Sequence, residues 1–251
     1  MQTKTDPTAG LIEALVSARQ TDRTVSAAPW GGALADATAA YAVQDAVAHA
    51  MGWFSSEVPQ HWKSGGPNRQ AVLTHAPLPP AGVRNSPARL ADMAFHTMGV
   101  EAEIALRLDQ SVSPAQAAGL TMDTASALID AMAVSIEIVD SRWQEGVDAT
   151  AMLRLADQQS HGALVLGDWV AYTPRDWAAQ RCVARTGVRE PVLRTGTHPL
   201  GHPAWLLPLW LQHATRHGAT VPSGTVVTTG TWVGILPANA GDKVVVEFGG
   251  I

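Results

Sequence analysis

The segment "AVSIEIVDSRW", residues 133–143, constrains the fold of this chain more than any other. Val134, Ile136 and Ile138 belong to an almost continuous apolar run, which is typical of a β-strand buried on both faces. Glu137 lies inside that run. A carboxylate in such a place is costly unless it is paired or bound to a cation. The segment therefore predicts a core strand and a partner for Glu137.

Two further carboxylates lie in "GVEAEIALRL", residues 99–108. Because side chains alternate along a strand, Glu101 and Glu103 leave from the same side. Taken alone, this pair is typical of the solvated face of an edge strand. Joined by Glu137, it forms a donor set without sulfur or imidazole, which suits a hard ion such as Mg²⁺ or Mn²⁺ and leaves positions open for water or a chelating substrate. Without the ion, Glu101 and Glu103 would repel each other and one pKa would rise.

From residue 98 onward strand signals dominate, and few helical patterns interrupt them. We expect strands at 98–107, 134–139, 163–172, 181–187, 191–195, 225–230 and 243–248, with "TGVREPVLRTG" (186–196) forming a hairpin. Helices are expected at 9–20, 33–52, 113–118, 123–133 and 203–217, and mostly loop with short extended pieces at 64–92. The regular strand–helix rhythm of a doubly wound fold is missing, so the pattern favours an α+β or mostly-β architecture.

Composition excludes several classes of protein. With 46% hydrophobic and 16% charged residues, the 251-residue chain is typical of a compact globular protein. The net charge of −5 and the lack of a basic cluster argue against a nucleic-acid surface. The lone Cys182 excludes an intrachain disulfide and a cysteine zinc site. Asp6 and Glu13 interrupt any signal-peptide core, and the apolar run 203–211 is too short to cross a bilayer, so we expect a cytoplasmic protein.

Lys63, in "PQHWKSGGPNR" (59–69), has two interpretations. Most lysines in flexible loops are simply solvated. This one follows Trp62 and precedes a glycine pair, so an aromatic wall would lower the local dielectric and a ligand could approach the backbone closely. Such a lysine can neutralise a substrate carboxylate or move a proton.

Two loops carry further candidates. In "LADQQSHGALVLG" (155–167), the polar residues Asp157, Ser160 and His161 precede a strand, where contacts to a ligand and capping of turns are equally common. In "VVTTGTWVG" (226–234), Gly230 and Thr231 follow a strand. They form either an ordinary turn or a set of backbone amides offered to an anion.

Other polar residues have simpler explanations. His213 and His217 are four apart on an expected helix, but Ala214 breaks the His-Glu-x-x-His pattern, and cations near a helix C-terminus are favourable by themselves. Asp140 and Arg142 are expected to form a structural ion pair.

Taken together, these motifs resemble the 2-keto-4-pentenoate hydratase and 4-oxalocrotonate decarboxylase group of the fumarylacetoacetate hydrolase superfamily. The resemblance covers most of the chain from about residue 36. The matching blocks, in order, are "AYAVQDAV" (40–47), "HWKSGG" (61–66), "GVEAEIALRL" (99–108), "EIVDSRW" (137–143), "ADQQSHGALVLG" (156–167), "LGHPAWLLPLWLQHATRHG" (200–218), "VVTTGTWVG" (226–234) and "GDKVVVEFGG" (241–250).

The resemblance implies roles for individual residues, a mixed β-roll fold and a homo-oligomer. It implies that Glu101, Glu103 and Glu137 bind Mg²⁺ or Mn²⁺, that Lys63 and Ser160 are catalytic, and that Asp157, His161, Gly230 and Thr231 contact the substrate. It also implies a division into a helical N-terminal region with a substrate-side loop, 1–92, and a β-roll catalytic domain, 93–251. The chain departs from its relatives at "SGGPNR" after the lysine, and at Gln158 and His161, where relatives have Asn and Ser.

The first functional hypothesis is a metal-dependent hydratase, a lyase that adds water to a short 2-hydroxy-2,4-dienoate or 2-oxo-enoate through a metal-bound enolate. A 2-oxo-3-enedioate decarboxylase shares that enolate. An acylpyruvate C–C hydrolase, with His75 and His161 as water activators, is a third hypothesis. Decarboxylases of this group resemble proteins that pair with hydratases, which adds a hydratase–decarboxylase complex as a partner and leaves a non-catalytic subunit as a fourth hypothesis.

Overall fold

A computed structural model describes residues 7–251. Residues 1–6, which include Asp6 and the start of the expected N-terminal region, lie outside the described residues. The main sheet contains β1 (His61–Gly65), β2 (Thr74–Pro77), β3 (Val83–Asn85), β4 (Gly99–Leu108), β5 (Ile129–Val139), β6 (His161–Ala171), β9 (Val226–Thr228) and β10 (Leu236–Pro237).

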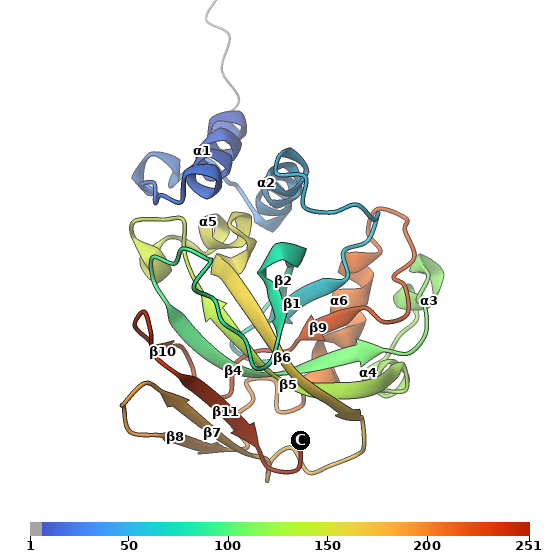
Figure 1. The fold of residues 1–251 in the computed structure, drawn as a ribbon. Coiled ribbons are helices and arrows are strands. Elements are labelled where there is room, and N and C mark those ends of the chain that lie inside the picture. Colours follow the sequence, from blue (N-terminus) through green and yellow to red (C-terminus); the bar gives the residue numbers. More distant parts are fainter. Residues whose placement is uncertain (1–6) are drawn as a thin grey trace, which may run out of the picture.

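This sheet curls around the centre of the molecule (Figure 1). Its strand order is β2-β1-β9-β4-β5-β6-β3, with β10 pairing to β4. The pairs β4–β5 and β5–β6 are antiparallel, whereas β1–β9 and β3–β6 are parallel. The sheet is therefore mixed and curled, with few helices, which confirms the expected α+β fold of the β-roll type.

Three helices gather at one end of the sheet (Figure 1). They are α1 (Pro7–Thr21), α2 (Ala37–Ala50) and α5 (Ala151–Ala156). Helix α2 begins where the Asp36 side chain accepts a hydrogen bond from the amide of Ala39. Leu11, Val43 and Leu153 pack into one apolar core between these helices.

A second apolar core is larger than the one between these three helices. It packs against the 3₁₀ helix η5 (Pro203–Leu206) and the helices α3 (Pro114–Ala118), α4 (Met122–Ser126) and α6 (Leu207–Ala214). A second sheet of three strands, in the order β11 (Val244–Phe248), β7 (Arg181–Thr186) and β8 (Val192–Thr195), contributes residues to the same core. Strands β7 and β8 form the expected hairpin. None of the helices in residues 7–251 combines the length and apolar character that crossing a membrane requires.

Two expectations about secondary structure were wrong in part. The expected helix 123–133 ends at Ser126, and residues from Ile129 onward extend strand β5 instead. The Ala- and Met-rich composition favours a helix, but pairing with β4 and β6 on both sides outweighs local propensity. The final expected helix, 203–217, is a 3₁₀ turn followed by α6, which ends at Ala214.

The short extended pieces expected within residues 64–92 are strands of the main sheet. Strands β2 and β3 both lie within residues 64–92, and β1 reaches into this segment. The division implied at residue 92 therefore falls between strands of one sheet, because β3 pairs with β6.

Candidate metal centre

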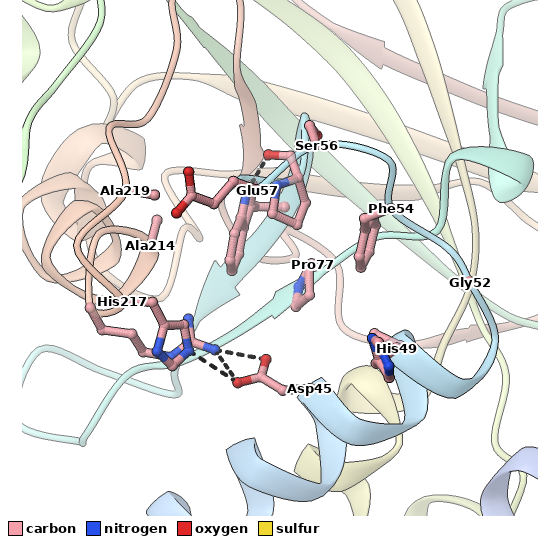
Figure 2. A pocket seen from close by; sticks show the side chains of 14 residues that line it. Asp45, His49, Gly52, Phe54, Ser56, Glu57, Pro77, Ala214, His217 and Ala219 are labelled. Atoms are coloured by element: carbon pink, nitrogen blue, oxygen red, sulfur yellow. Dashed lines mark hydrogen bonds and ion pairs between the residues drawn. The ribbon is translucent and has the colours of Figure 1, made fainter.

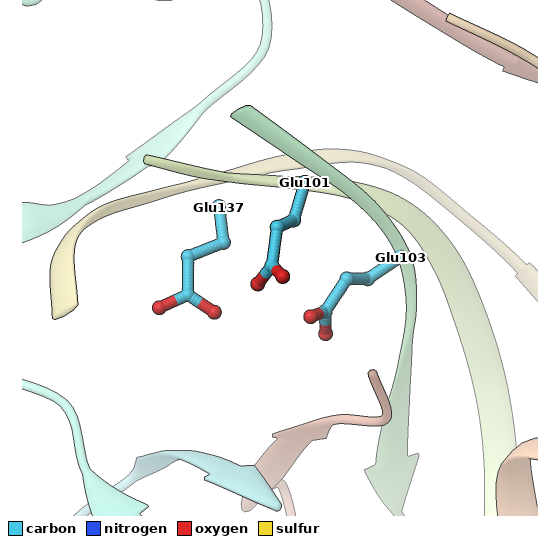
Figure 3. Close-up of side chains that lie close together, drawn as sticks. All are labelled: Glu101, Glu103 and Glu137. Atoms are coloured by element: carbon cyan, nitrogen blue, oxygen red, sulfur yellow. The ribbon is translucent and has the colours of Figure 1, made fainter. Parts of the chain in front are cut away.

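Three glutamates from two adjacent strands form an acidic cluster. In the antiparallel register of β4 and β5, Glu101 lies directly opposite Glu137. Alternation along β4 places Glu103 on the same face. One carboxylate oxygen from each residue lies within 4.8 Å of the others, and Figure 3 shows the three side chains pointing to the same side of the sheet. Strand pairing thus brings Glu137 next to two residues that precede it by 34 and 36 positions in the sequence.

Burial makes this cluster electrostatically unfavourable without a cation. Glu103 is 2% exposed and Glu137 is 0% exposed. Burial, with the negative charges of the neighbouring glutamates, raises the pKa of Glu101 to about 8 and that of Glu103 to about 7. A divalent cation between the carboxylates would remove this repulsion, and three oxygen donors suit a hard ion.

Lys63 lies beside the cluster on strand β1. Its Nζ atom donates hydrogen bonds to Glu137 Oε1 at 2.5 Å and to the carbonyl oxygen of Gln159 at 3.2 Å. Burial by itself would lower the pKa of Lys63, but the three glutamates outweigh it and the pKa is raised. The same ammonium group and His161 hold the pKa of Glu137 below its usual value, although burial opposes them.

The surroundings of Lys63 differ from the expectation. Lys63 lies in a strand instead of a flexible loop, and Trp62 points to the opposite face of that strand, where it packs against Trp210. The prediction that Trp62 lowers the dielectric around Lys63 was therefore wrong. Lys63 is partly buried, with 13% of its side chain exposed, and contacts Glu137 and the Gln159 backbone instead.

Glu137 offers an oxygen suited to a metal ion. Its Oε1 atom accepts a hydrogen bond from Lys63 Nζ and a second one from His161 Nδ1, the latter at 3.0 Å. Its Oε2 atom is buried and has no hydrogen-bond partner. A buried carboxylate oxygen without a partner is rare and costly. The donor set and this unpartnered oxygen fit a divalent cation, so the cluster can hold one.

A left-handed turn lies next to the cluster. Gln158, Gln159 and Ser160 have φ angles of 47°, 53° and 56°, a conformation that residues other than glycine seldom adopt. The turn presents the Gln159 carbonyl oxygen to Lys63. Ser160 is buried, and its hydroxyl has no partner within the described residues.

Asp157, at the start of this turn, is surrounded by cations. Its Oδ1 atom accepts hydrogen bonds from Arg142 Nε at 2.6 Å and from Arg19 Nη2 at 2.8 Å, and its Oδ2 accepts one from the Arg142 amide. Asp157 is fully buried, and Arg142 also contacts Asp140 at 3.6 Å. The expected Asp140–Arg142 ion pair is thus present. Asp157 anchors the turn, and its contact with substrate stays a prediction.

The turn after β9 also reaches the cluster. The amide of Gly230 donates a hydrogen bond to Glu103 Oε2 at 3.0 Å. Gly230 has a φ of 100°, which a side chain would disfavour. The hydroxyl of Thr231 donates to the carbonyl oxygen of Gly234 within the same turn. The Gly230 amide thus faces a glutamate of the protein, and the contact of Gly230 and Thr231 with a substrate stays a prediction.

Two residues of this region escaped the sequence analysis. Ser135 lies opposite Glu103 in the β4–β5 register and is fully buried with an unpartnered hydroxyl. Its spacing of two from Glu137 could have shown that both share a face. Gln159 acts through its backbone oxygen, which no side-chain pattern reveals.

The other histidines singled out from the sequence are His75, His213 and His217. His75 bonds to Ser64 at 2.8 Å and stacks on His213 with ring centroids 4.7 Å apart. In the β1–β2 register, Ser64 and His75 are paired on the face opposite Lys63, so the geometry does not support His75 as a water activator. His217 contacts Asp45, and within residues 7–251 neither it nor His213 joins a cluster of potential ligands.

A separate cavity of about 420 Å³ opens beside α2 and the end of α6. Figure 2 shows Phe54 and Pro77 along it and the Asp45–His217 contact at one end. Trp62 also lines this cavity, so it lies on the side of β1 away from Lys63. The cavity and the acidic cluster are therefore distinct features.

Comparison with known proteins agrees with the fold. The model of the fumarylacetoacetate (FAA) hydrolase C-terminal family matches residues 43–251. No curated protein matches the chain. Among solved structures, a 4-oxalocrotonate decarboxylase from Pseudomonas putida G7 complexed with magnesium and adipate is 19% identical, with a TM-score of 0.83 over 100% of this chain and 96% of that one.

Two further solved structures are similar to this chain. The same Pseudomonas putida decarboxylase complexed with calcium and acetate is 19% identical and gives a TM-score of 0.81 over 100% of this chain and 96% of that one. A 5-carboxymethyl-2-hydroxymuconate delta-isomerase from Mycobacterium smegmatis is 20% identical and gives 0.54 over 76% of this chain and 72% of that one. With the mixed curled sheet and the family model in agreement, the chain belongs to the fumarylacetoacetate hydrolase C-terminal family.

Proposed function

We propose that this chain is a Mg²⁺-dependent decarboxylase of short 2-oxo-3-enedioates. The observation that supports it most is the convergence of three carboxylates, two of them buried, and Lys63 on one point. When bound there, the ion would supply a Lewis acid that stabilises negative charge on the carboxylate and the 2-oxygen of the substrate. The full-length likeness to a 4-oxalocrotonate decarboxylase complexed with magnesium and adipate supports the same choice.

The positions of the histidines favour decarboxylation over hydration. Water addition needs a group that activates water. His161 contacts Glu137, and His75 lies on the other face of the sheet. Decarboxylation needs only a sink for the electron pair and a proton donor. In this step the bond to the distal carboxylate breaks, CO₂ leaves, and the electron pair passes through the conjugated system to the 2-oxygen, giving a dienolate.

Lys63 is the proton donor in this proposal. Its ammonium group donates a hydrogen bond to Glu137 Oε1 and lies beside the acidic cluster, where a substrate bound to the ion would reach it. Transfer of a proton from this group to the dienolate gives a 2-hydroxy-2,4-dienoate, and Lys63 is then reprotonated from solvent. The unpartnered hydroxyl of Ser160 is proposed to bind the substrate beside it.

The test is to incubate the protein with Mg²⁺ and 2-oxo-3-hexenedioate and to measure trapped CO₂ together with the ultraviolet absorbance of the dienoate. We expect one CO₂ per substrate consumed, and loss of the reaction with EDTA. Glu103→Gln is the matched variant, because it keeps the shape of the side chain and removes its charge. Consumption of substrate without CO₂ would contradict the proposal.

Hydration of a 2-hydroxy-2,4-dienoate is the second candidate, supported by the sequence motifs shared with 2-keto-4-pentenoate hydratases. Loss of the diene with formation of a hydroxy-2-oxo acid would establish it. Pyruvate release from acetylpyruvate would instead indicate a C–C hydrolase. Failure of all three substrates, together with no metal binding, would indicate the non-catalytic subunit.

We also propose that the chain forms a homo-oligomer, on the basis of the family resemblance. Light scattering coupled to size-exclusion chromatography measures the mass directly. A particle of 26.4 kDa, the mass of one chain, would contradict this proposal.

A further inference from the structure

The carboxylate of Glu137 is held asymmetrically by two side chains. Lys63 Nζ and His161 Nδ1 both contact Oε1, whereas Oε2 has no partner. The last torsion of a glutamate side chain is broad and roughly twofold, so staggered rotamers do not fix the plane of the carboxylate. Hydrogen bonds to Oε1 must do so instead.

His161 reaches Glu137 from the neighbouring strand. It begins β6, immediately after the left-handed turn, and its ring is 2% exposed. The register of β5 and β6 pairs Glu137 with Leu164, and the ladder is irregular between Ile138 and Val139, where His161 pairs. This irregularity accompanies a close approach, because a Cβ on Gly162 would lie 2.8 Å from the carbonyl oxygen of Ile138.

The far side of the His161 ring is closed by backbone. The 3₁₀ turn η2 (Pro80–Gly82) packs there, and a Cβ placed on Gly82 would lie 3.7 Å from His161 Nε2 and 3.2 Å from the carbonyl oxygen of Gly162. Nε2 is buried and has no partner among the described residues. The imidazole thus lies between Glu137 and a turn of the protein, with no space for a substrate on the Nε2 side.

We infer that His161 is a positioning residue: its Nδ1–H group holds Glu137 Oε1 so that Oε2 stays directed at the metal position between Glu101 and Glu103. Figure 3 shows one oxygen of Glu137 turned toward the other two carboxylates. This inference rests on the metal role of the three glutamates given under Proposed function. It replaces the expected contact between His161 and the substrate.

The inference has a defined stereochemical consequence. An asparagine amide can occupy the place of Nδ1, whereas a glutamine amide reaches the place of Nε2. Outer-shell partners of metal ligands typically contribute about 10- to 100-fold in metal affinity. His161→Asn should therefore keep the metal affinity of the parent protein, and His161→Gln and His161→Ala should lose about 10- to 100-fold.

The experiment measures Mn²⁺ binding to the full chain by isothermal titration and electron paramagnetic resonance, without substrate. His202→Asn is the control. His202 caps η5 by accepting a hydrogen bond from the Ala204 amide, a role that asparagine retains, and it lies outside the acidic cluster. Thermal unfolding of each variant shows whether it is folded, and His161→Asn, the closest in size, keeps the test decisive if His161→Ala does not fold.

Several outcomes would overturn the inference. If His161→Ala binds Mn²⁺ with the affinity of the parent protein, His161 has no positioning role. The same conclusion follows if His161→Gln keeps the Mn²⁺ affinity and His161→Asn loses it. An equal loss of Mn²⁺ affinity in His161→Asn and His161→Gln would mean that the imidazole acts only through its packing. A parent protein that binds no Mn²⁺ removes both this inference and the metal site. Because the titration contains no substrate, a parent protein that binds Mn²⁺ but releases no CO₂ contradicts only the proposed reaction.

Discussion

At the scale of single residues, burial and the charge of Lys63 together set the protonation of the three glutamates. Glu101 and Glu103 are pushed toward the protonated form, while Glu137 is kept ionised by Lys63. This split follows from position: Lys63 donates to Glu137 and not to the other two. The metal-free site is therefore poised to release protons when a cation enters.

Glu103→Gln tests the ligand role directly. The substitution keeps the volume of the side chain and removes its charge. Residues that only contact a metal ligand contribute up to about 100-fold in metal affinity, so loss of a ligand charge should lower the Mn²⁺ affinity by at least about 100-fold. Titration calorimetry measures it. Glu247→Gln, at an exposed ion pair with Arg185, is the control and should bind the ion as the parent does.

The raised pKa values predict how stability depends on pH. Glu101 and Glu103 bind protons more tightly in the folded state than at the usual value of 4.5, so folding is favoured below that value and loses this contribution as pH rises through about 7 and 8. EDTA-treated protein should show a Tm that falls between pH 5 and 8. Saturating Mg²⁺ should reduce that fall, and a Tm that rises over this range without metal would refute the assignment.

At the scale of elements, one turn connects the helical end of the molecule to the site. The turn 158–160 begins at Asp157, whose carboxylate is bound by Arg142 from the segment after β5 and by Arg19 from α1. Gln158 also accepts a hydrogen bond from Arg19. The helical region thus supports the backbone that presents Gln159 to Lys63.

Asp157→Asn should destabilise the protein by about 3–5 kcal/mol, because it removes the carboxylate charge that pairs with Arg19 and leaves Arg142 only its 3.6 Å contact with Asp140. Urea unfolding measures this loss. Asp130→Asn is the matched control, since the Asp130–Arg107 pair is about one-third exposed and should contribute less than about 1 kcal/mol. Equal losses in the two variants would show that Asp157 is not a buried anchor.

At the scale of the whole molecule, metal binding should stabilise the complete fold. The cluster and its contacts come from β1, β4, β5, β6 and the turn after β9, so the site cannot persist when the sheet unfolds. An ion at 100 times its Kd should raise the free energy of unfolding by about 2.7 kcal/mol. Chemical denaturation with Mg²⁺ and with EDTA measures the difference, and no change would argue against a site built by the native sheet.

Sequence patterns predicted the parts of this protein that depend on local periodicity. Alternation placed Glu101 and Glu103 on one face, and the apolar run around Glu137 predicted that it needs a partner. The family motifs predicted the mixed β-roll, which the topology confirms. Helix propensity gave a wrong prediction where strand pairing is stronger. The helix expected at 123–133 ends early, and residues from Ile129 onward belong to β5.

The sequence by itself determined the fold class, because strand patterns and the family motifs both indicate it. Residue type and alternation also indicated the three carboxylates and the lysine as candidates, and the family resemblance implied their roles. Tertiary structure alone decided that Glu101 faces Glu137, that Lys63 contacts Glu137 instead of Trp62, and that His161 contacts Glu137. Strand register, the left-handed turn at 158–160 and the closure by Gly82 produce these contacts. They depend on distances between segments far apart in the chain, which no local pattern encodes.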